Sequence, residues 1–210
     1  MGFYIGKQRI TPVINKGRKY GADIDLLLGG VNSEGTYVVP TTRFVLDLTG
    51  IKKVPGAGLF GTFMRQTNIT KVEASSIESI LDYGCYMTFR SCRNITSADL
   101  SGLKTLTTES MYQMFYDCAA LVDVNLSSLT SCGINALAAA FYKCIALKTI
   151  SFPSLTTVTL TSFGSGTYAF QGCTALEEIH FRADMQSTIE TLLGYSTKFG
   201  ATNATIFFDL

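Results

Sequence analysis

The chain has 210 residues, of which 47% are hydrophobic and 16% are charged, so it can bury a core and is not expected to be disordered. Seventeen basic and 16 acidic residues leave a net charge of +1, which gives no reason to expect nucleic acid as a partner. No run reaches 18 apolar residues, and the first residues lack a long apolar segment. We therefore expect neither membrane insertion nor a secretory signal.

The first 35 residues do not follow the repeat found in the rest of the chain. The stretch "FYIGKQRITPVI" predicts a hairpin around Gly6, and residues 23–39 predict two further strands with a Gly-rich turn. The first 20 residues contain five basic residues and no acidic one. We expect residues 1–35 to form a β-rich cap, with a docking module as the alternative.

An internal repeat with a period of 26 occupies the middle of the chain. Phenylalanines recur in steps of 26, 26, 26 and 29, and a cysteine follows most of them three residues later. The repeated aromatics are Phe63, Phe89, Phe115, Phe141 and Phe170, and the cysteines are Cys92, Cys118, Cys144 and Cys173. The three extra residues of the last step lie in "TSFGSG" (161–166), which predicts a loop.

Each repeat combines two hydrophobic periods. Met111, Phe115 and Cys118 are spaced as on one face of a short helix, and Ser110 with Gln113 forms a capping-box pattern that would begin it. In "LVDVNL" (121–126), apolar and polar residues alternate as in a strand with one buried face.

One strand and one short helix per 20–29 residues is the leucine-rich-repeat arrangement. A single coil cannot bury its apolar side alone, so coils stack into an array. We predict an α/β repeat fold in which residues 36–182 form a leucine-rich-repeat solenoid of about five to six coils.

Two stretches support a family. "AFQGCTALEEIHF" (169–181) and "FYKCIALKTISFPSL" (141–155), with Pro153 after the strand, resemble the BspA-like, bacterial surface-antigen type of leucine-rich repeat. This resemblance implies non-enzymatic binding and adhesion proteins, usually at bacterial surfaces. The two ends of the chain resemble repeat proteins encoded in prophage regions near tail genes, which implies a structural or receptor-binding component of a phage-like tail as the alternative.

Residues 183–210 are predicted to form a C-terminal cap. Ser187 and Glu190 form a second capping-box pattern, and Gly194 is suited to end the helix. The segment "ATIFFDL" (204–210) predicts a last strand that covers the open end of the array.

Two further patterns could suggest a cofactor site or a metal site, but the repeat accounts for both. "GAGLFG" (56–61) fits the dinucleotide pattern G-x-G-x-x-G, but Phe60 and Phe63 already belong to the repeat. Cysteines spaced one per coil would lie in a row and not around one metal ion, so we expect buried free thiols. We expect no metal and no cofactor.

Catalysis is not expected either. The single histidine, His180, lies in the outward column of the last repeat strand, and its neighbours at matching positions offer only Ser151 and Asn125. A nucleophile would need a base beside it.

The outward columns of the strands are the candidate binding site. One column contains Asp47, Glu73, Asp99, Asn125, Ser151 and His180, and the neighbouring column contains Asp123. We predict possible partner contacts at Asp47, Glu73, Asp99, Asp123, Asn125 and His180, where an acidic patch would attract a basic partner or a cation. A solvated face without function is the alternative.

Aromatic residues form further columns on the predicted helical side. One contains Phe60, Tyr86 and Tyr112, and another contains Tyr116 and Tyr142. We expect them to pack between coils, although exposed rings could bind a sugar or a protein. The partner is thus predicted to be a protein or glycan surface, met at a cell surface or in a phage particle. The oligomeric state does not follow from the sequence.

Overall fold

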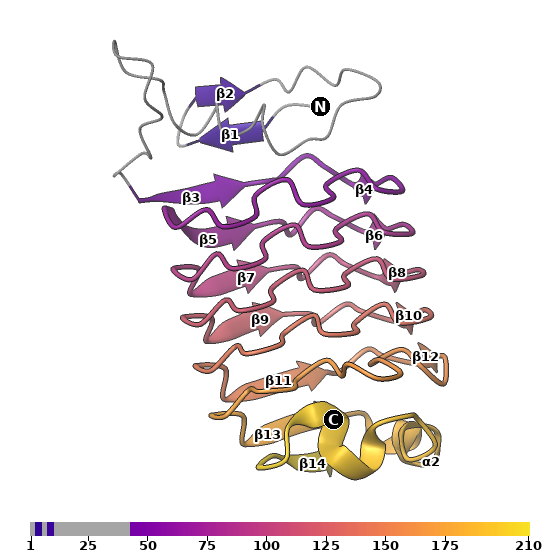
Figure 1. Cartoon of the computed structure of the whole chain (residues 1–210). Coiled ribbons are helices and arrows are strands. Elements are labelled where there is room, and N and C mark those ends of the chain that lie inside the picture. Colours follow the sequence, from indigo (N-terminus) through magenta and orange to yellow (C-terminus); the bar gives the residue numbers. More distant parts are fainter. Residues whose placement is uncertain (1–2, 6–7, 11–42) are drawn as a thin grey trace.

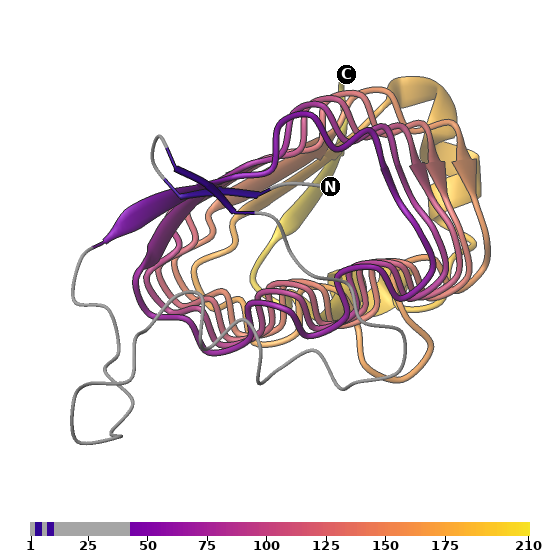
Figure 2. The same ribbon diagram turned by 90° about the horizontal axis from the view of Figure 1, so that it is seen from above.

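The computed structural model describes residues 3–5, 8–10 and 43–210. From residue 43 on, the chain winds into coils that stack along one axis (Figure 1). Seen along that axis, the coils superpose, with the long strands on one side and irregular backbone on the opposite side (Figure 2). The predicted solenoid of stacked repeats is therefore confirmed.

The long strands lie side by side on one face, which we call the sheet face. They form two groups, ordered β2-β1-β3-β5-β7-β9 and β11-β13-β14. Strands β3, β5, β7 and β9 pair in parallel, as do β11, β13 and β14. The repeat strands are β3 (Phe44–Asp47), β5 (Ile69–Glu73), β7 (Ser97–Asp99), β9 (Asp123–Asn125), β11 (Thr149–Phe152) and β13 (Glu178–Phe181).

The N-terminal end of the sheet is formed by a short antiparallel pair. Strands β1 (Phe3–Ile5) and β2 (Gln8–Ile10) pair with each other, and β1 also pairs antiparallel with β3. This confirms the strand pair expected on either side of Gly6. The strands expected within 23–39 lie outside the described residues.

A second sheet of two-residue strands runs along one edge of the solenoid. It forms because the chain turns after each long strand and extends again, and its strands pair in parallel in the order β12-β10-β8-β6-β4. These strands are β4 (Lys53–Val54), β6 (Ser79–Ile80), β8 (Thr105–Leu106), β10 (Ser131–Cys132) and β12 (Thr157–Val158).

The prediction of a short helix in each coil is wrong. Its place is taken by a run of tight turns with a positive φ at every fourth residue, such as Tyr83 (58°), Met87 (56°) and Ser91 (61°). Ser110 does not cap a helix: its hydroxyl donates to the Thr107 carbonyl, 3.2 Å away. Gln113, the other half of the predicted capping box, is itself left-handed with a φ of 53°.

Hydrogen bonding explains why this turn run replaces a helix. In the run that begins near Tyr83, every second N–H donates to the next coil, as from Cys85 to Ser110 (2.8 Å) and from Met87 to Tyr112 (2.9 Å). The alternate N–H groups donate three residues back within the same coil, as from Tyr86 to Tyr83 (3.2 Å). In a helix all of these donors would bond within the segment. The turn run instead ties each coil to its neighbour, and these bonds offset the roughly 1–2 kcal/mol that each left-handed residue costs.

The core lies between the two sheets and the turn runs. Its centre is a row of stacked phenylalanines whose ring centroids are 5.5–5.9 Å apart, which we call the inner aromatic row. Its members are Phe63, Phe89, Phe115, Phe141 and Phe170, all buried. The row forms because residues one repeat apart occupy equivalent places in successive coils.

A C-terminal cap follows the last repeat strand. It contains η1 (Ala183–Met185), α2 (Gln186–Ile189), η2 (Tyr195–Gly200) and β14 (Thr205–Phe208). The predicted last strand is confirmed, because β14 pairs in parallel with β13. The predicted capping box is wrong: α2 begins at Gln186, so Ser187 lies within it, and the N-cap residue Met185 makes no side-chain cap bond.

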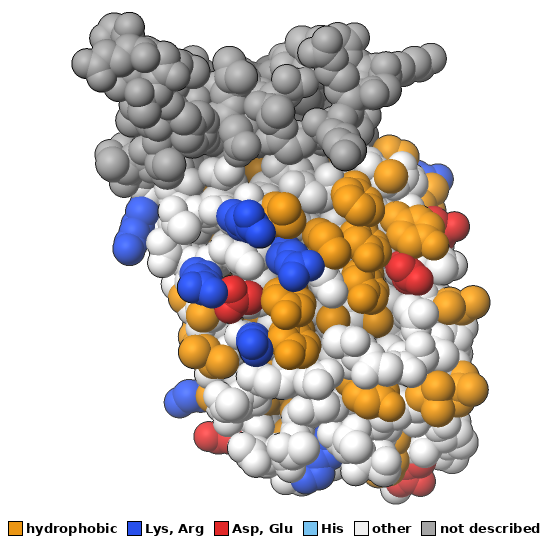
Figure 3. Space-filling view, viewed as in Figure 1, with side chains coloured by type: hydrophobic (Ala, Val, Ile, Leu, Met, Phe, Trp, Pro, Cys, Tyr) orange, Lys and Arg blue, Asp and Glu red, His pale blue; other side chains and the backbone are white. Residues whose placement is uncertain are grey.

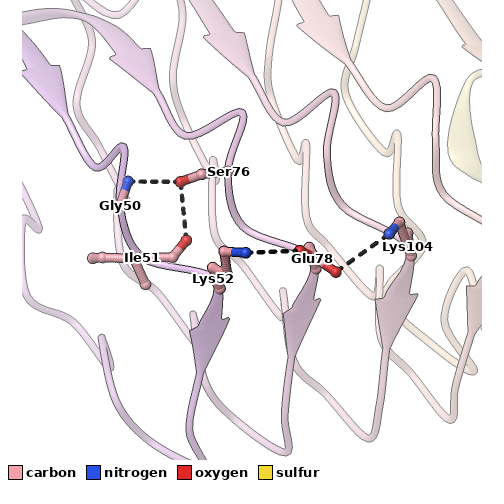
Figure 4. A network of polar contacts seen from close by, with 6 residues as sticks. All are labelled: Gly50, Ile51, Lys52, Ser76, Glu78 and Lys104. Atoms are coloured by element: carbon pink, nitrogen blue, oxygen red, sulfur yellow. Dashed lines mark hydrogen bonds and ion pairs between the residues drawn. The ribbon is translucent and has the colours of Figure 1, made fainter.

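Polar side chains brace neighbouring coils at the edge of the solenoid (Figure 4). The Ser76 hydroxyl accepts a hydrogen bond from the Gly50 N–H (2.9 Å) and donates to the Ile51 carbonyl (3.1 Å) of the preceding coil. Glu78 lies between two lysines of adjacent coils, Lys52 (3.9 Å) and Lys104 (3.2 Å). All three side chains are well exposed, so these ion pairs contribute little to stability.

Candidate functional site

The sheet face places the predicted site residues in two columns. Asp47 is in register with Glu73, Glu73 with Asp99, and Asp99 with Asn125. Asp123 lies in the neighbouring column, in register with Ser97. His180, on β13, is in register with Ser151 of β11 and so lies further along the array. The structure thus brings the first four residues together on adjacent strands.

We call the column of Asp47, Glu73, Asp99 and Asn125 the acidic column, and three of its members also form a turn. Asp47, Asp99 and Asn125 each accept a hydrogen bond from the backbone N–H two residues later, at 2.8, 2.9 and 3.0 Å. Short Asp and Asn side chains favour this turn because their oxygen reaches that N–H. Since Asn125 does the same as the two aspartates, the turn requires an acceptor oxygen and not a charge. The column therefore has a structural role whether or not it binds a partner.

His180 is held by carboxylates of its own chain. Its Nδ1 lies 2.9 Å from Asp209 Oδ1, and its Nε2 lies 3.2 Å from Glu178 Oε2. The ring therefore presents Nε2 to Glu178 and not to Ser151, the one hydroxyl in register with it. This arrangement does not activate a serine nucleophile, which needs a free ring nitrogen beside its hydroxyl.

The opposite side of the solenoid carries exposed aromatic rings. We call this surface the turn face; it is formed by residues 55–67, 81–93, 107–119 and 133–145. Phe60, Tyr86 and Tyr112 stack on one another with centroids 4.7 Å apart at both steps, and we call them the outer aromatic row. The expected packing between coils is confirmed, yet Phe60 remains 43% exposed, whereas Phe63 three residues later is 3% exposed.

Further apolar side chains extend the outer aromatic row. Tyr83 is 42% exposed and packs on Tyr86 with a centroid distance of 6.0 Å, and Met64 is 37% exposed. Figure 3 shows hydrophobic side chains gathered down this face over successive coils. Single exposed apolar residues are common on proteins, but a contiguous group of large ones indicates an interaction surface.

Basic side chains lie on the same face as the aromatic rings (Figure 3). The Arg90 guanidinium lies 4.4 Å from the centroid of the Tyr116 ring and donates to Gln113 at 2.6 Å. Tyr116 in turn stacks on Tyr142 at 4.5 Å, and the Lys143 ammonium lies 5.5 Å from the Tyr142 centroid. Such contacts hold cations and rings in a fixed relation at an exposed surface.

The six cysteines lie beneath these surfaces and are all buried and free, as predicted. Four of them donate a hydrogen bond to the carbonyl of the inner-row phenylalanine one coil earlier, as from Cys118 to Phe89 (3.1 Å). Burial raises the pKa of Cys92 to about 12. These thiols are therefore packing groups and carbonyl donors, and not nucleophiles or ligands.

The remaining sequence motif does not form a chemical site. The "GAGLFG" segment begins the first turn run, where Ala57 and Gly61 have positive φ values of 54° and 61°. Across residues 43–210 and the two short N-terminal strands, the side chains form no group of three or more His, Cys, Asp or Glu suited to a metal ion. No helix in this described part is long and apolar enough to cross a membrane.

Sequence reasoning missed two features of the turn face. The first is the left-handed backbone, for which the sequence offers few local signals: Gly61, Asp117 and Asn135 are residue types that tolerate positive φ. The second is the exposure of the outer aromatic row. Its members recur with the same period as those of the inner row, so spacing alone cannot distinguish the two.

The repeats of this chain match a known family model. A family model described as the BspA type leucine rich repeat region matches residues 60–166 and 137–199, in six copies. A leucine-rich-repeat protein of T. pallidum has a similar solved structure, with a TM-score of 0.43 and 16% sequence identity over 74% of this chain and 69% of that one. No curated protein matches the sequence.

The two matched ranges overlap and together span residues 60–199, well over half of the 210 residues. They include most of the first turn run, the other three turn runs, the inner aromatic row and most of the repeat strands. The chain therefore belongs to the BspA-type leucine-rich-repeat family.

Proposed function

We propose that this chain is a non-enzymatic recognition module that binds another protein through its turn face. Leucine-rich repeats generally mediate protein interactions, and the present array offers a rigid surface built from equivalent positions of successive coils. Display at a bacterial surface or in a tail-like assembly, the two settings implied by the sequence resemblances, would use the same face.

The observation that carries this proposal is the exposure of Phe60, in the outer aromatic row, and of Tyr83, which packs beside that row on Tyr86. Phe60 and Tyr83 each leave about two fifths of their side chain in water, at 43% and 42%. The core does not require them, because the inner aromatic row already fills it with five buried phenylalanines. Burying these rings against a partner would add hydrophobic free energy that the isolated chain does not gain.

The orientation of the rings favours a protein over a glycan. Phe60 and Tyr86 are nearly parallel, at 5°, and Tyr86 and Tyr112 are at 15°. Stacking therefore covers both faces of the Tyr86 ring and one face each of Phe60 and Tyr112, so little ring-face area is left for a sugar. A sugar binds an aromatic residue through the face of the ring, whereas protein side chains also pack against ring edges.

The composition of the turn face supports the same partner class. Tyrosine, methionine and arginine are the residues enriched at protein interfaces, and Tyr83, Met64 and Arg90 all lie here. Arg90 is already fixed by Tyr116 and Gln113, so little side-chain entropy would be lost when a partner binds.

The proposal can be tested by site-specific photocrosslinking in an extract of the organism that encodes the chain. A benzophenone amino acid at position 60 places the reactive group in the outer aromatic row. The matched control places it at position 45 on the sheet face, because Val45 has a similar exposure of 40%. We expect a discrete protein adduct from position 60 and none from position 45.

Two outcomes would contradict this proposal. The first is an adduct from position 45 alone, which would assign binding to the sheet face and to the acidic column. The second is glycan-array binding that survives Phe60→Ser and Tyr83→Ser together, with no protein adduct from position 60.

A further inference from the structure

The histidine of the last repeat strand connects that strand to the C-terminal cap. His180 projects from β13, and its ring stacks on Phe207 of β14, with centroids 4.9 Å apart and an angle of 14°. Asp209, just after β14, reaches back to the same ring. Three side chains on the outward side of the sheet thus connect the last two strands of the solenoid.

Both ring nitrogens face acceptors. Nδ1 lies 2.9 Å from Asp209 and Nε2 lies 3.2 Å from Glu178. A neutral imidazole carries one N–H and can donate to only one of these carboxylates, whereas the imidazolium donates to both. The geometry therefore suits the protonated ring.

Within residues 43–210, the charges that act on the ring are those of Asp209 and Glu178. On the β11 side the residue in register is Ser151, which is uncharged. Arg182 and Asp184, which follow β13, form an ion pair with each other at 2.5 Å. Partial burial disfavours the charged ring, but the hydrogen bonds and charges of Asp209 and Glu178 outweigh it, so the pKa of His180 is raised above its ordinary value of 6.5.

Strand β14 covers the edge of β13 and part of the core at the C-terminal end. It pairs in parallel with β13, and Phe208 packs on the buried Phe181 with centroids 6.1 Å apart. The Thr205 N–H also donates to the Glu177 carbonyl at 2.7 Å. Detachment of β14 would expose the edge of β13 and part of the core at this end.

We propose that His180 is a protonation-dependent latch that fastens the C-terminal strand β14 to the array. With the ring protonated, Glu178 and Asp209 are both satisfied and β14 is held. When the ring loses its proton, it can donate to only one of the two carboxylates and no longer attracts Asp209 by opposite charge, so β14 opens more often. Because the folded-state pKa is raised, this stabilisation is fully present below about pH 6.5 and is lost as the pH rises through the folded-state value.

The titration of the ring can be observed without assignment, because His180 is the only histidine. The NMR shift of its ring protons should give a pKa above 6.5 in the wild type, and Asp209→Asn and Glu178→Gln should each lower it. The control Glu177→Gln, on the same segment but without a contact to the ring, should leave it unchanged. A wild-type pKa at or below 6.5, or equal values in all four proteins, would overturn the proposal.

Opening of β14 is measured by amide hydrogen exchange. Between pH 5.5 and 8.5, after correction for intrinsic exchange, the protection factors of the β14 amides should fall roughly twofold to fivefold in the wild type, as expected for a partly exposed ion pair. In His180→Gln they should stay constant over this range, with the protection of β5 and β7 unaffected in both proteins. A pH-independent β14 in the wild type, or an equal fall in His180→Gln, would refute the latch.

Discussion

The sheet face and the turn face are built by the same sequence period but by different backbone rules. On the sheet face the strands extend, and residues alternate in and out. On the turn face every fourth residue is left-handed, and alternate N–H groups bond to the next coil. One sequence repeat therefore aligns side chains in columns on both faces, but the sheet face is polar and the turn face is aromatic.

The largest expected difference is in the free energy of unfolding between variants of the inner and outer aromatic rows. Phe115→Ala removes a fully buried ring that stacks on Phe89 (5.5 Å) and Phe141 (5.9 Å), and it should lower the free energy of unfolding by about 3–5 kcal/mol. Phe60→Ala removes an exposed ring and should cost less than about 1.5 kcal/mol. Urea unfolding followed by circular dichroism measures both. Equal losses would mean that the rows are not separated into core and surface.

Thiol reactivity distinguishes the buried native cysteines from a cysteine placed on the exposed turn face. Burial raises the pKa of Cys85 and Cys132 from 9.0 to about 12, so the thiolate fraction falls about a thousandfold. At pH 8 the native protein should not react with a thiol reagent on the timescale in which Met64→Cys, on the exposed turn face, reacts fully. In denaturant all six native cysteines should react. Fast reaction of any native cysteine would contradict the burial of the six thiols.

Variants of Asp99, in the acidic column, separate the effect of its charge on stability from the effect of its hydrogen bond to the turn. Asp99→Ala removes the acceptor for the Ser101 N–H and should destabilise the protein by about 1–1.5 kcal/mol, whereas Asp99→Asn keeps the acceptor and should cost little. Thermal unfolding compares the two variants. If both were equally destabilised, the charge and not the turn would be the important property.

The same column also tests which face binds. The triple variant Asp47→Asn, Glu73→Gln and Asp99→Asn removes three carboxylates while leaving the turn face intact. It should retain the crosslinked adduct obtained at position 60. Loss of that adduct in a folded triple variant would favour the sheet face, as the sequence columns first suggested.

The strands were predictable because their signal is local. In "LVDVNL" apolar and polar residues alternate, and the structure buries Val124 and Leu126 while Asp123 and Asn125 face outward. The regular spacing of the repeats then placed Asp47, Glu73 and Asp99 in one column, and the registers agree. Whether that column binds a partner stays a prediction.

The turn runs were not predictable for two physical reasons. The spacing of Met111, Phe115 and Cys118 fits both a helix and a turn run that repeats every four residues. The bonds that decide between them connect different coils, as from Phe115 to Ala140 (2.8 Å), and leave no local trace. The exposure of Phe60 likewise depends on how the coils are shaped and not on residue type.

The backbone of the turn face can be tested directly at Gly61. Its φ is 61°, and a Cβ added there would meet no atom within 4 Å, so only the backbone preference changes on substitution. The matched control is Gly166→Ala, which also adds a Cβ into open space but at a position without a positive φ, and which should be nearly neutral.

Urea unfolding of Gly61→Ala tests the central claim that a left-handed turn run, and not a helix, forms this face. The structure predicts a loss of about 1 kcal/mol, because alanine is strained at positive φ. A helix at this position would predict the opposite sign, a gain of roughly 0.5–1 kcal/mol, because alanine is the better helix former. A stabilised Gly61→Ala variant would therefore contradict the account of the turn face and of the aromatic surface built on it.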